Sequence, residues 1–259
     1  MLTVLGAGAL SDFNAVSLGR NFKSFRLVDG NPMSPSYWGR LNIPVEPVVT
    51  DISRCLDNWS KAVARSGGSW DDVLKLIRGL GDPPTAGYFA KSDAVLSLNL
   101  LSQLEVGWQE ALEPILKKRF GRLFVGRREQ EWLDAIRPSS KSLAEQHLRS
   151  LECSGAQSIL LITDVEYLEY TGRRYSRKVH QSPPVRWSES GWEADPAIQF
   201  ETMPALEGVA LDAGTFVRWM PSYQLEWQDC WLWHISPNGT EATSYGTVHR
   251  VVAFSLRRY

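Results

Sequence analysis

The sequence predicts an α/β protein whose core is a doubly wound, mostly parallel β-sheet that ends in antiparallel strands. Over residues 1–172, short and nearly continuous apolar runs alternate with amphipathic segments. This order is typical of parallel strands that helices bury on both faces. Small or acidic residues follow most of these runs, as they do where such a sheet binds a ligand. Toward the C-terminus, apolar and polar residues alternate in the pattern of antiparallel strands.

Five apolar runs in the first part predict the parallel strands. They cover residues 2–5, 25–29, 44–50, 93–99 and 158–164. Apolar spacing and capping residues predict the helices between them. These helices cover residues 13–18, 34–38, 55–65, 69–80, 100–104, 108–120 and 130–136, with a longer one after Pro138. Because βαβ crossovers are right-handed, this order of elements favours a sheet that is covered on both faces.

Residues 173–259 predict an irregular aromatic segment followed by two antiparallel strands, over 225–235 and 247–256. Both strands would complete the same sheet, so residues 1–172 and 173–259 are expected to form one domain overall. Trp227, Trp231 and Trp233 fall on one face of the first of these strands. We expect that face to pack between sheet and helix rather than to form an aromatic cage.

The composition excludes several classes of protein. The chain has 259 residues with 28 Lys+Arg against 29 Asp+Glu, so it lacks the positive surplus that nucleic-acid binding needs. Its apolar runs are shorter than the ~20 residues of a membrane-spanning helix, and its first residues lack the pattern of a signal peptide. Three cysteines without a CxxC pair fit a reducing, cytoplasmic setting. No two histidines have metal-ligand spacing, so no metal site is expected.

The ends of the predicted strands carry the candidate binding residues. Gly6, Ala7 and Gly8 follow the first strand, and glycines let a ligand lie against the backbone. Asp29 ends the second strand, 23 positions after Gly6, where a carboxylate can accept hydrogen bonds from ribose hydroxyls. Asp51 ends the third strand and could bind an exocyclic amine of adenine. Each acid has an alternative: Asp29 could form a turn, and Asp51 could cap the following helix.

Residues 4–10, 27–29, 49–52 and 93–102 resemble the successive cofactor motifs of class I S-adenosylmethionine-dependent methyltransferases. Residues 97–104 and 160–164 further resemble a bacterial methyltransferase-like group within that superfamily. The resemblance implies a Rossmann-like methyltransferase fold with S-adenosylmethionine as cofactor. The glycine turn would then lie against the methionine part, Asp29 would bind the ribose and Asp51 would lie by the adenine. Ser97, Leu98 and Asn99 would lie near the methyl donor.

The sequence also departs from the superfamily's pattern. The usual acid before the first glycine is Val4, and the third glycine of the loop is Leu10. The helix that usually precedes the first strand is missing, so a partner or a second copy could cover one face of the pocket. The departures leave open a catalytically inactive methyltransferase-like binding module that acts through a partner. An NAD(P)-dependent oxidoreductase is less favoured, because its third glycine would fall at Ser11.

The methyl acceptor is expected to be a small molecule, with residues 108–136 and 174–221 forming its lid. The catalytic candidates are Asn99, Asp164 and His180. Asn99 and Asp164 could instead cap the segments that follow them. His147 is expected to be a structural histidine with a satisfied partner, and the histidines of the last two strands are expected to be structural as well. Trp38 is expected to pack in its helix rather than stack on adenine.

Overall fold

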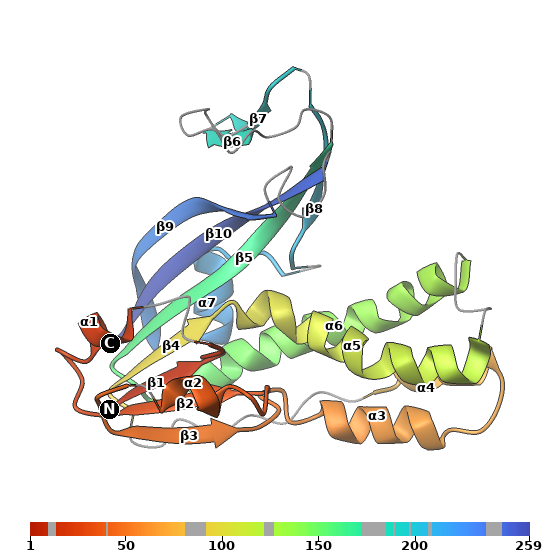
Figure 1. Cartoon of the computed structure of the whole chain (residues 1–259), viewed down its shortest axis with the longest axis horizontal. Helices are drawn as coiled ribbons and strands as arrows, with labels where there is room; N and C mark the ends of the chain where they lie inside the picture. Colours follow the sequence, from red (N-terminus) through yellow and green to blue (C-terminus); the bar gives the residue numbers. More distant parts are fainter. Residues whose placement is uncertain are drawn as a thin grey trace.

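The protein, in a computed structural model, is a mixed α/β molecule built around one eight-stranded sheet (Figure 1). The structure describes residues 1–9, 14–39, 41–80, 92–121, 127–171, 185–188, 190–196, 198–206, 209–236 and 245–259. The strand order is β3-β2-β1-β4-β5-β10-β9, and β8 pairs with the outer part of β5. This order confirms the predicted fold class.

The first five strands are parallel, and they lie where the apolar runs predicted them. They are β1 (Leu2–Leu5), β2 (Phe25–Asp29), β3 (Val45–Val49), β4 (Ala94–Leu98) and β5 (Ser158–Thr171). β1 pairs with β2 on one side and with β4 on the other. The chain therefore builds the sheet outward from β1 to β3, and then crosses over to place β4 on the opposite side of β1.

Each face of the parallel sheet has its own core. On one face, helices α6 (Arg127–Glu152) and α7 (Ala213–Trp219) pack against residues such as Leu161 and Phe254. We call this the helical face. On the opposite face, the short helices α1 (Ala15–Leu18) and α2 (Pro35–Trp38) pack against β1, β2 and β4. Both faces are covered over these inner strands, as the near-continuous apolar runs predicted.

A bundle of helices extends from the sheet and has a separate core. It consists of α3 (Leu56–Arg65), α4 (Trp70–Arg78), α5 (Leu100–Phe120) and much of α6 (Figure 1). A capping box between Ser69 and Asp72 starts α4. The predicted breaks before Trp108 and at Pro138 are wrong, since α5 and α6 are continuous and contain Pro114 and Pro138. Apolar packing on both sides of each proline offsets its local cost of about 3 kcal/mol.

The outer half of the sheet is a long antiparallel extension. β5, β9 (Tyr223–Ser236) and β10 (Tyr245–Arg258) have 14 residues each and continue past the end of β4 (Figure 1). β8 (Gln199–Pro204) then takes the place beside β5. The prediction of an irregular segment here is wrong in part, because β8 and the hairpin of β6 (Val185–Ser188) and β7 (Gly191–Ala194) lie within it.

The prediction that the tryptophans of β9 are core residues is also wrong. Trp227 is 50% exposed, and Trp231 and Trp233 are 40% exposed each. Among the described strands theirs is the outermost of the sheet, with β10 as its one hydrogen-bonded neighbour. Their side chains lie on the face opposite the helical face, where α1 and α2 cover only the inner strands. None of the described helices is both long and apolar enough to cross a membrane.

Candidate functional site

The candidate site lies at the carboxyl ends of β1, β2 and β4. The chain leaves β1 toward β2 but leaves β4 toward β5, so the strand order reverses between β1 and β4. In open α/β sheets the two loops separate at such a point and form a crevice that binds ligands. Gly6, Ala7 and Gly8 lie on one of these loops and Asn99 begins the other, and we call the place between them the crevice.

The two glycines of the first loop have different structural roles. Gly6 has φ +71°, and a Cβ there would lie 2.6 Å from the carbonyl oxygen of Leu98. It is therefore required for the close approach of the β1 and β4 ends. Gly8 has φ +46°, and the nearest atom to a Cβ there would be the Gly6 carbonyl oxygen at 4.0 Å. Ala7 is buried in the core. Of the three residues, Gly8 is the one at which a Cβ would meet no closer atom among the described residues.

The Gly8 peptide is held from both sides by side chains of the next strand and helix. Its N–H donates to Asp29 Oδ2 at 2.8 Å, and its carbonyl oxygen accepts from Trp38 Nε1 at 3.0 Å. Trp38 is buried beneath the loop, which confirms the packing interpretation of this residue. Asp29 thus joins the end of β2 to the glycine turn, a contact that fixes both at the crevice.

Asp29 also organises its own turn. Its Oδ1 accepts from the Asn31 N–H at 2.7 Å and from the Ser34 hydroxyl at 3.1 Å. An ionised carboxylate offers about four acceptor positions, and the described residues occupy three of them. The remaining one belongs to Oδ2, the oxygen that faces Gly8. The carboxylate is therefore rigidly placed and can still accept one hydrogen bond from a ligand.

Asp51 makes contacts that favour the capping interpretation. Its Oδ1 accepts from the N–H and the hydroxyl of Ser53, at 2.9 and 2.6 Å. Its Oδ2 accepts from the N–H of Leu56, the first residue of α3, at 2.9 Å. Both oxygens thus satisfy donors at the start of the helix. The two acids predicted to flank the nucleoside therefore differ: Asp29 is joined to the glycine turn, and Asp51 to α3.

The side chains of Ser97 and Leu98 point into the two cores. The Ser97 hydroxyl lies 2.9 Å from Nε2 of His147 on α6, and both residues are buried. Burial lowers the pKa of His147 to about 4, so the ring is neutral at pH 7. These contacts confirm that His147 is a structural histidine with a partner. Leu98 belongs to the core beneath α2, so only the backbone of these two residues is available to a ligand.

Asn99 has an unsatisfied polar atom at the crevice. It adopts the left-handed conformation, with φ 51° and ψ 15°, and its N–H donates to the Ile162 carbonyl oxygen at 2.7 Å. Its side chain makes no capping hydrogen bond to α5, so the capping alternative is wrong. Its Oδ1 is buried without a hydrogen-bond partner among the described residues. A buried acceptor of this kind is costly unless a donor reaches it.

Asp164 is linked to Asn99 through the Ser102 hydroxyl, and it approaches His249, which the sequence predicts to be a structural histidine. Its Oδ2 accepts from the Ser102 hydroxyl at 3.1 Å. Its Oδ1 lies 3.3 Å from His249 Nδ1, although the alignment is not that of a hydrogen bond. The Tyr167 ring lies 4.4 Å from the His249 ring. His249 lies close to Asp164 because of the register in which β10 pairs with β5, and the sequence did not predict that register. His180, the third catalytic candidate, lies outside the described residues.

The described residues hold no cluster of three or more His, Cys, Asp or Glu side chains that could bind a metal ion. The polar groups gathered at the crevice are instead a carboxylate, an amide and an Asp–His pair. Such groups can donate and accept hydrogen bonds.

No protein-family model matches the chain, and no curated protein matches it. Several solved structures are similar to it at low identity. One, titled for the conversion of a disulfide bond into a thioacetal group during echinomycin biosynthesis, is 14% identical over 99% of this chain and 75% of that chain, with a TM-score of 0.39. A SAM-dependent methyltransferase from Anabaena variabilis is 9% identical over 100% and 76%, also at 0.39. An S-adenosylmethionine-dependent methyltransferase from Mesorhizobium loti is 8% identical over 99% and 90%, at 0.36.

Proposed function

We propose that the protein binds S-adenosylmethionine in the crevice between the β1 and β4 loops and transfers its methyl group to a small molecule. The observation that carries this proposal is the doubly held Gly8 peptide, which fixes Asp29 at the point where the strand order reverses. A nucleoside bound there meets a carboxylate at the spacing that suits ribose hydroxyls and a loop without side chains.

The residues present fit the chemical groups of this cofactor. The free acceptor position on Asp29 Oδ2 receives a ribose hydroxyl. Among the described residues, no atom lies closer than 4.0 Å to a Cβ built on Gly8, so the part of the ligand next to the ribose can approach the backbone there. The buried Oδ1 of Asn99 supplies an acceptor for the ammonium group of the methionine part. The cofactor itself supplies an electrophilic methyl group on sulfur, so the protein contributes mainly alignment.

Asp164 and His249 are proposed for the acceptor side of the crevice. A carboxylate beside an imidazole orients the ring and stabilises its protonated form. His249 can therefore accept a proton from an acceptor that must lose one, while Asp164 is held in place by Ser102. His249 lies at the surface of the β10 extension with 17% of its side chain exposed, so a small molecule can reach it.

A catalytically inactive binding module remains the second candidate. Two observations favour it over an active methyltransferase. The carboxylate of Asp51 is occupied by its own helix start, and Val4, at the position of the usual acid, is wholly buried. Both features reduce the number of contacts that a bound nucleoside would receive. A methyltransferase would need those contacts to align its cofactor.

Calorimetric titration with S-adenosylmethionine, S-adenosylhomocysteine and NAD(H) tests the proposal. We expect one site for the two sulfur compounds and none for NAD(H).

The variant Asp29→Ala should weaken S-adenosylhomocysteine binding by about 1–3 kcal/mol, because the hydrogen bond from the ligand to a charged carboxylate is lost. The matched variant Asp51→Ala should keep the affinity but lower the free energy of unfolding by about 1 kcal/mol, because α3 loses its cap. Absence of binding to all three compounds would refute the proposal, and binding without methyl transfer would favour the inactive module.

A further inference from the structure

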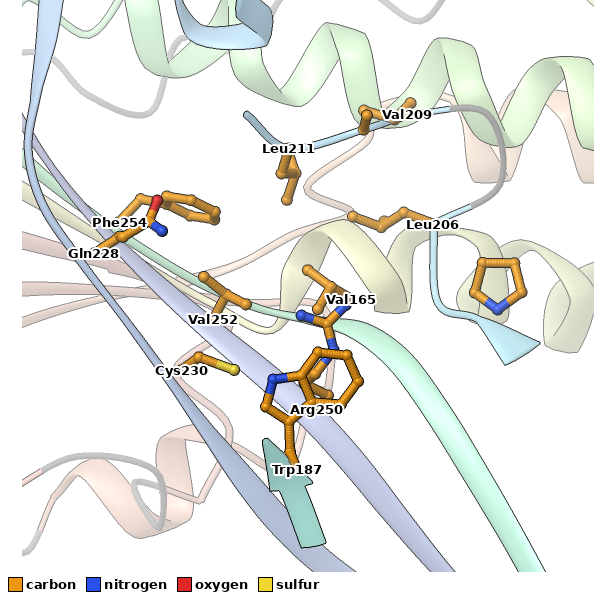
Figure 2. A pocket seen from close by; sticks show the side chains of 12 residues that line it. Val165, Trp187, Leu206, Val209, Leu211, Gln228, Cys230, Arg250, Val252 and Phe254 are labelled. Atoms are coloured by element: carbon orange, nitrogen blue, oxygen red, sulfur yellow. The ribbon is translucent and has the colours of Figure 1, made fainter. Parts of the chain in front are cut away.

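A separate cavity of about 520 Å³ lies on the helical face of the antiparallel extension (Figure 2). Its floor is formed by Val165 on β5 and by Val252 and Phe254 on β10. One wall is the segment after β8, where the chain leaves the sheet before α7, and Leu206 and Leu211 point inward from it. Binding sites for small molecules typically have volumes of about 300–1,000 Å³ and mostly apolar walls.

The fold explains why this region is hollow. Pairing of β10 with β5 shifts between Arg250 and Val251, so Val165 has no opposite residue on β10 and forms a bulge. The helix α7 begins only at Ala213, after an N-cap at Asp212. The described residues 205–206 and 209–212, which lie between β8 and α7, are not helical, and room is left above Val165 and Val252.

Most side chains that line the cavity are apolar, and Arg250 places hydrogen-bond donors among them. Its Nε donates to Glu166 Oε2 at 3.0 Å, and its guanidinium carbon lies 4.3 Å from the centre of the Trp187 ring. These two contacts fix the plane of the guanidinium, and its other nitrogens extend toward Val165 (Figure 2). Gln228 lies at the other end of the cavity, beside Phe254 (Figure 2). The cavity thus has an apolar middle with a polar group at each end.

We infer that this cavity is a binding site for a small molecule that combines an apolar part with an anionic oxygen group, such as a carboxylate. The apolar body fills the space over Val165 and Val252, and the oxygens accept from the terminal N–H groups of Arg250. Glu166 already offsets the charge of Arg250. The choice of ligand therefore depends more on hydrogen-bond geometry and on the shape of the apolar walls than on net charge. The inference concerns a different part of the molecule from the cofactor crevice and does not rest on the proposed function.

The test uses the full chain and the dye 1-anilinonaphthalene-8-sulfonate, which has aromatic rings, an anionic oxygen group and fluorescence that rises in apolar surroundings. We expect saturable one-site binding. Leu211→Trp and Cys230→Trp, which fill the cavity from opposite sides, should each weaken binding by roughly tenfold or more. Arg250→Gln should weaken it by roughly tenfold, since a charge-assisted hydrogen bond is lost.

Arg257→Gln is the matched control. Arg257 lies on the same strand and is paired with Glu226 at 3.9 Å on the exposed surface, outside the cavity. Its variant should bind the dye like the parent protein. Circular dichroism on each variant checks folding, and the two filling variants keep the test informative if one of them does not fold. Equal affinity of the folded filling variants and the parent, equal effects of the two arginine variants, or displacement of the dye by S-adenosylhomocysteine would overturn the inference.

Discussion

Two groups of tryptophans in this molecule have opposite environments. Trp59, Trp108 and Trp132 lie in the helix bundle, with ring centres 4.7 Å apart for the first pair and 6.3 Å apart for the second. Trp108 is completely buried, whereas Trp231 on β9 is 40% exposed. A helix of the bundle has packed neighbours on several sides. An edge strand has one paired neighbour, so the same side chain contributes to the core in the bundle and to the surface on β9.

The largest expected effect is the loss of a bundle tryptophan. Trp108→Ala should lower the free energy of unfolding by about 3–5 kcal/mol, because it leaves a large cavity. Trp231→Ala should lower it by less than about 1 kcal/mol, because much of the ring is already in water. Chemical denaturation of both variants measures the difference. Equal losses would mean that β9 is covered in solution, for example by a second copy.

The next-largest expected effect is a change of stability with pH, which we compare for His147 on α6 and His234 on β9. Burial lowers the pKa of His147 to about 4 from 6.5. His147 therefore binds a proton below about pH 6.5 in the unfolded chain, but only below about pH 4 in the folded chain. Stability from this group is complete above pH 6.5 and is lost as the pH falls toward 4, by roughly 3 kcal/mol in total.

Replacing the histidines separates the two regions. His147→Gln should remove most of this loss between pH 6.5 and 4, as measured by denaturation at a series of pH values. His234 on β9 also has a pKa lowered by burial, but it is only partly enclosed. His234→Gln is the matched control and should change the pH dependence less. A larger effect from His234 than from His147 would contradict the burial of α6 against the sheet.

The contrast between the regions also explains which features the sequence could predict. Continuous apolar runs require burial on both faces, and so the five parallel strands and the glycine turn followed from local residues. The position of Asp29 at the end of β2 followed in the same way. The exposure of Trp231 depends on β9 being the outermost strand, which is a property of the whole sheet order. The approach of His249 to Asp164 depends on strand register, and alternation alone leaves register undetermined.

A smaller effect sharpens the comparison within the bundle itself. The Nε1 of Trp108 is buried without a hydrogen-bond partner among the described residues. Trp108→Phe removes this unsatisfied N–H together with part of the ring, so its cost should be well below that of Trp108→Ala, at about 1–2 kcal/mol. In contrast, Trp70→Phe loses the hydrogen bond to Glu131 Oε2 at 2.8 Å and should cost at least as much. The denaturation midpoints of the two variants give the order, and a much larger loss for Trp108→Phe would show that its N–H has a partner.

The smallest expected effect on stability is that of Trp231→Thr. Threonine is β-branched and suits a strand, so the change should alter the free energy of unfolding by less than about 1 kcal/mol. The same variant should reduce the fraction of tryptophan fluorescence that iodide quenches, because iodide reaches exposed rings such as Trp227, Trp231 and Trp233. Trp108→Phe should not reduce that quenched fraction, because the Trp108 ring is completely buried and iodide does not reach it. If iodide instead quenches the parent and the Trp231→Thr variant equally, the face of β9 is shielded in solution, and the two groups of tryptophans are more alike than their burial in the single chain indicates.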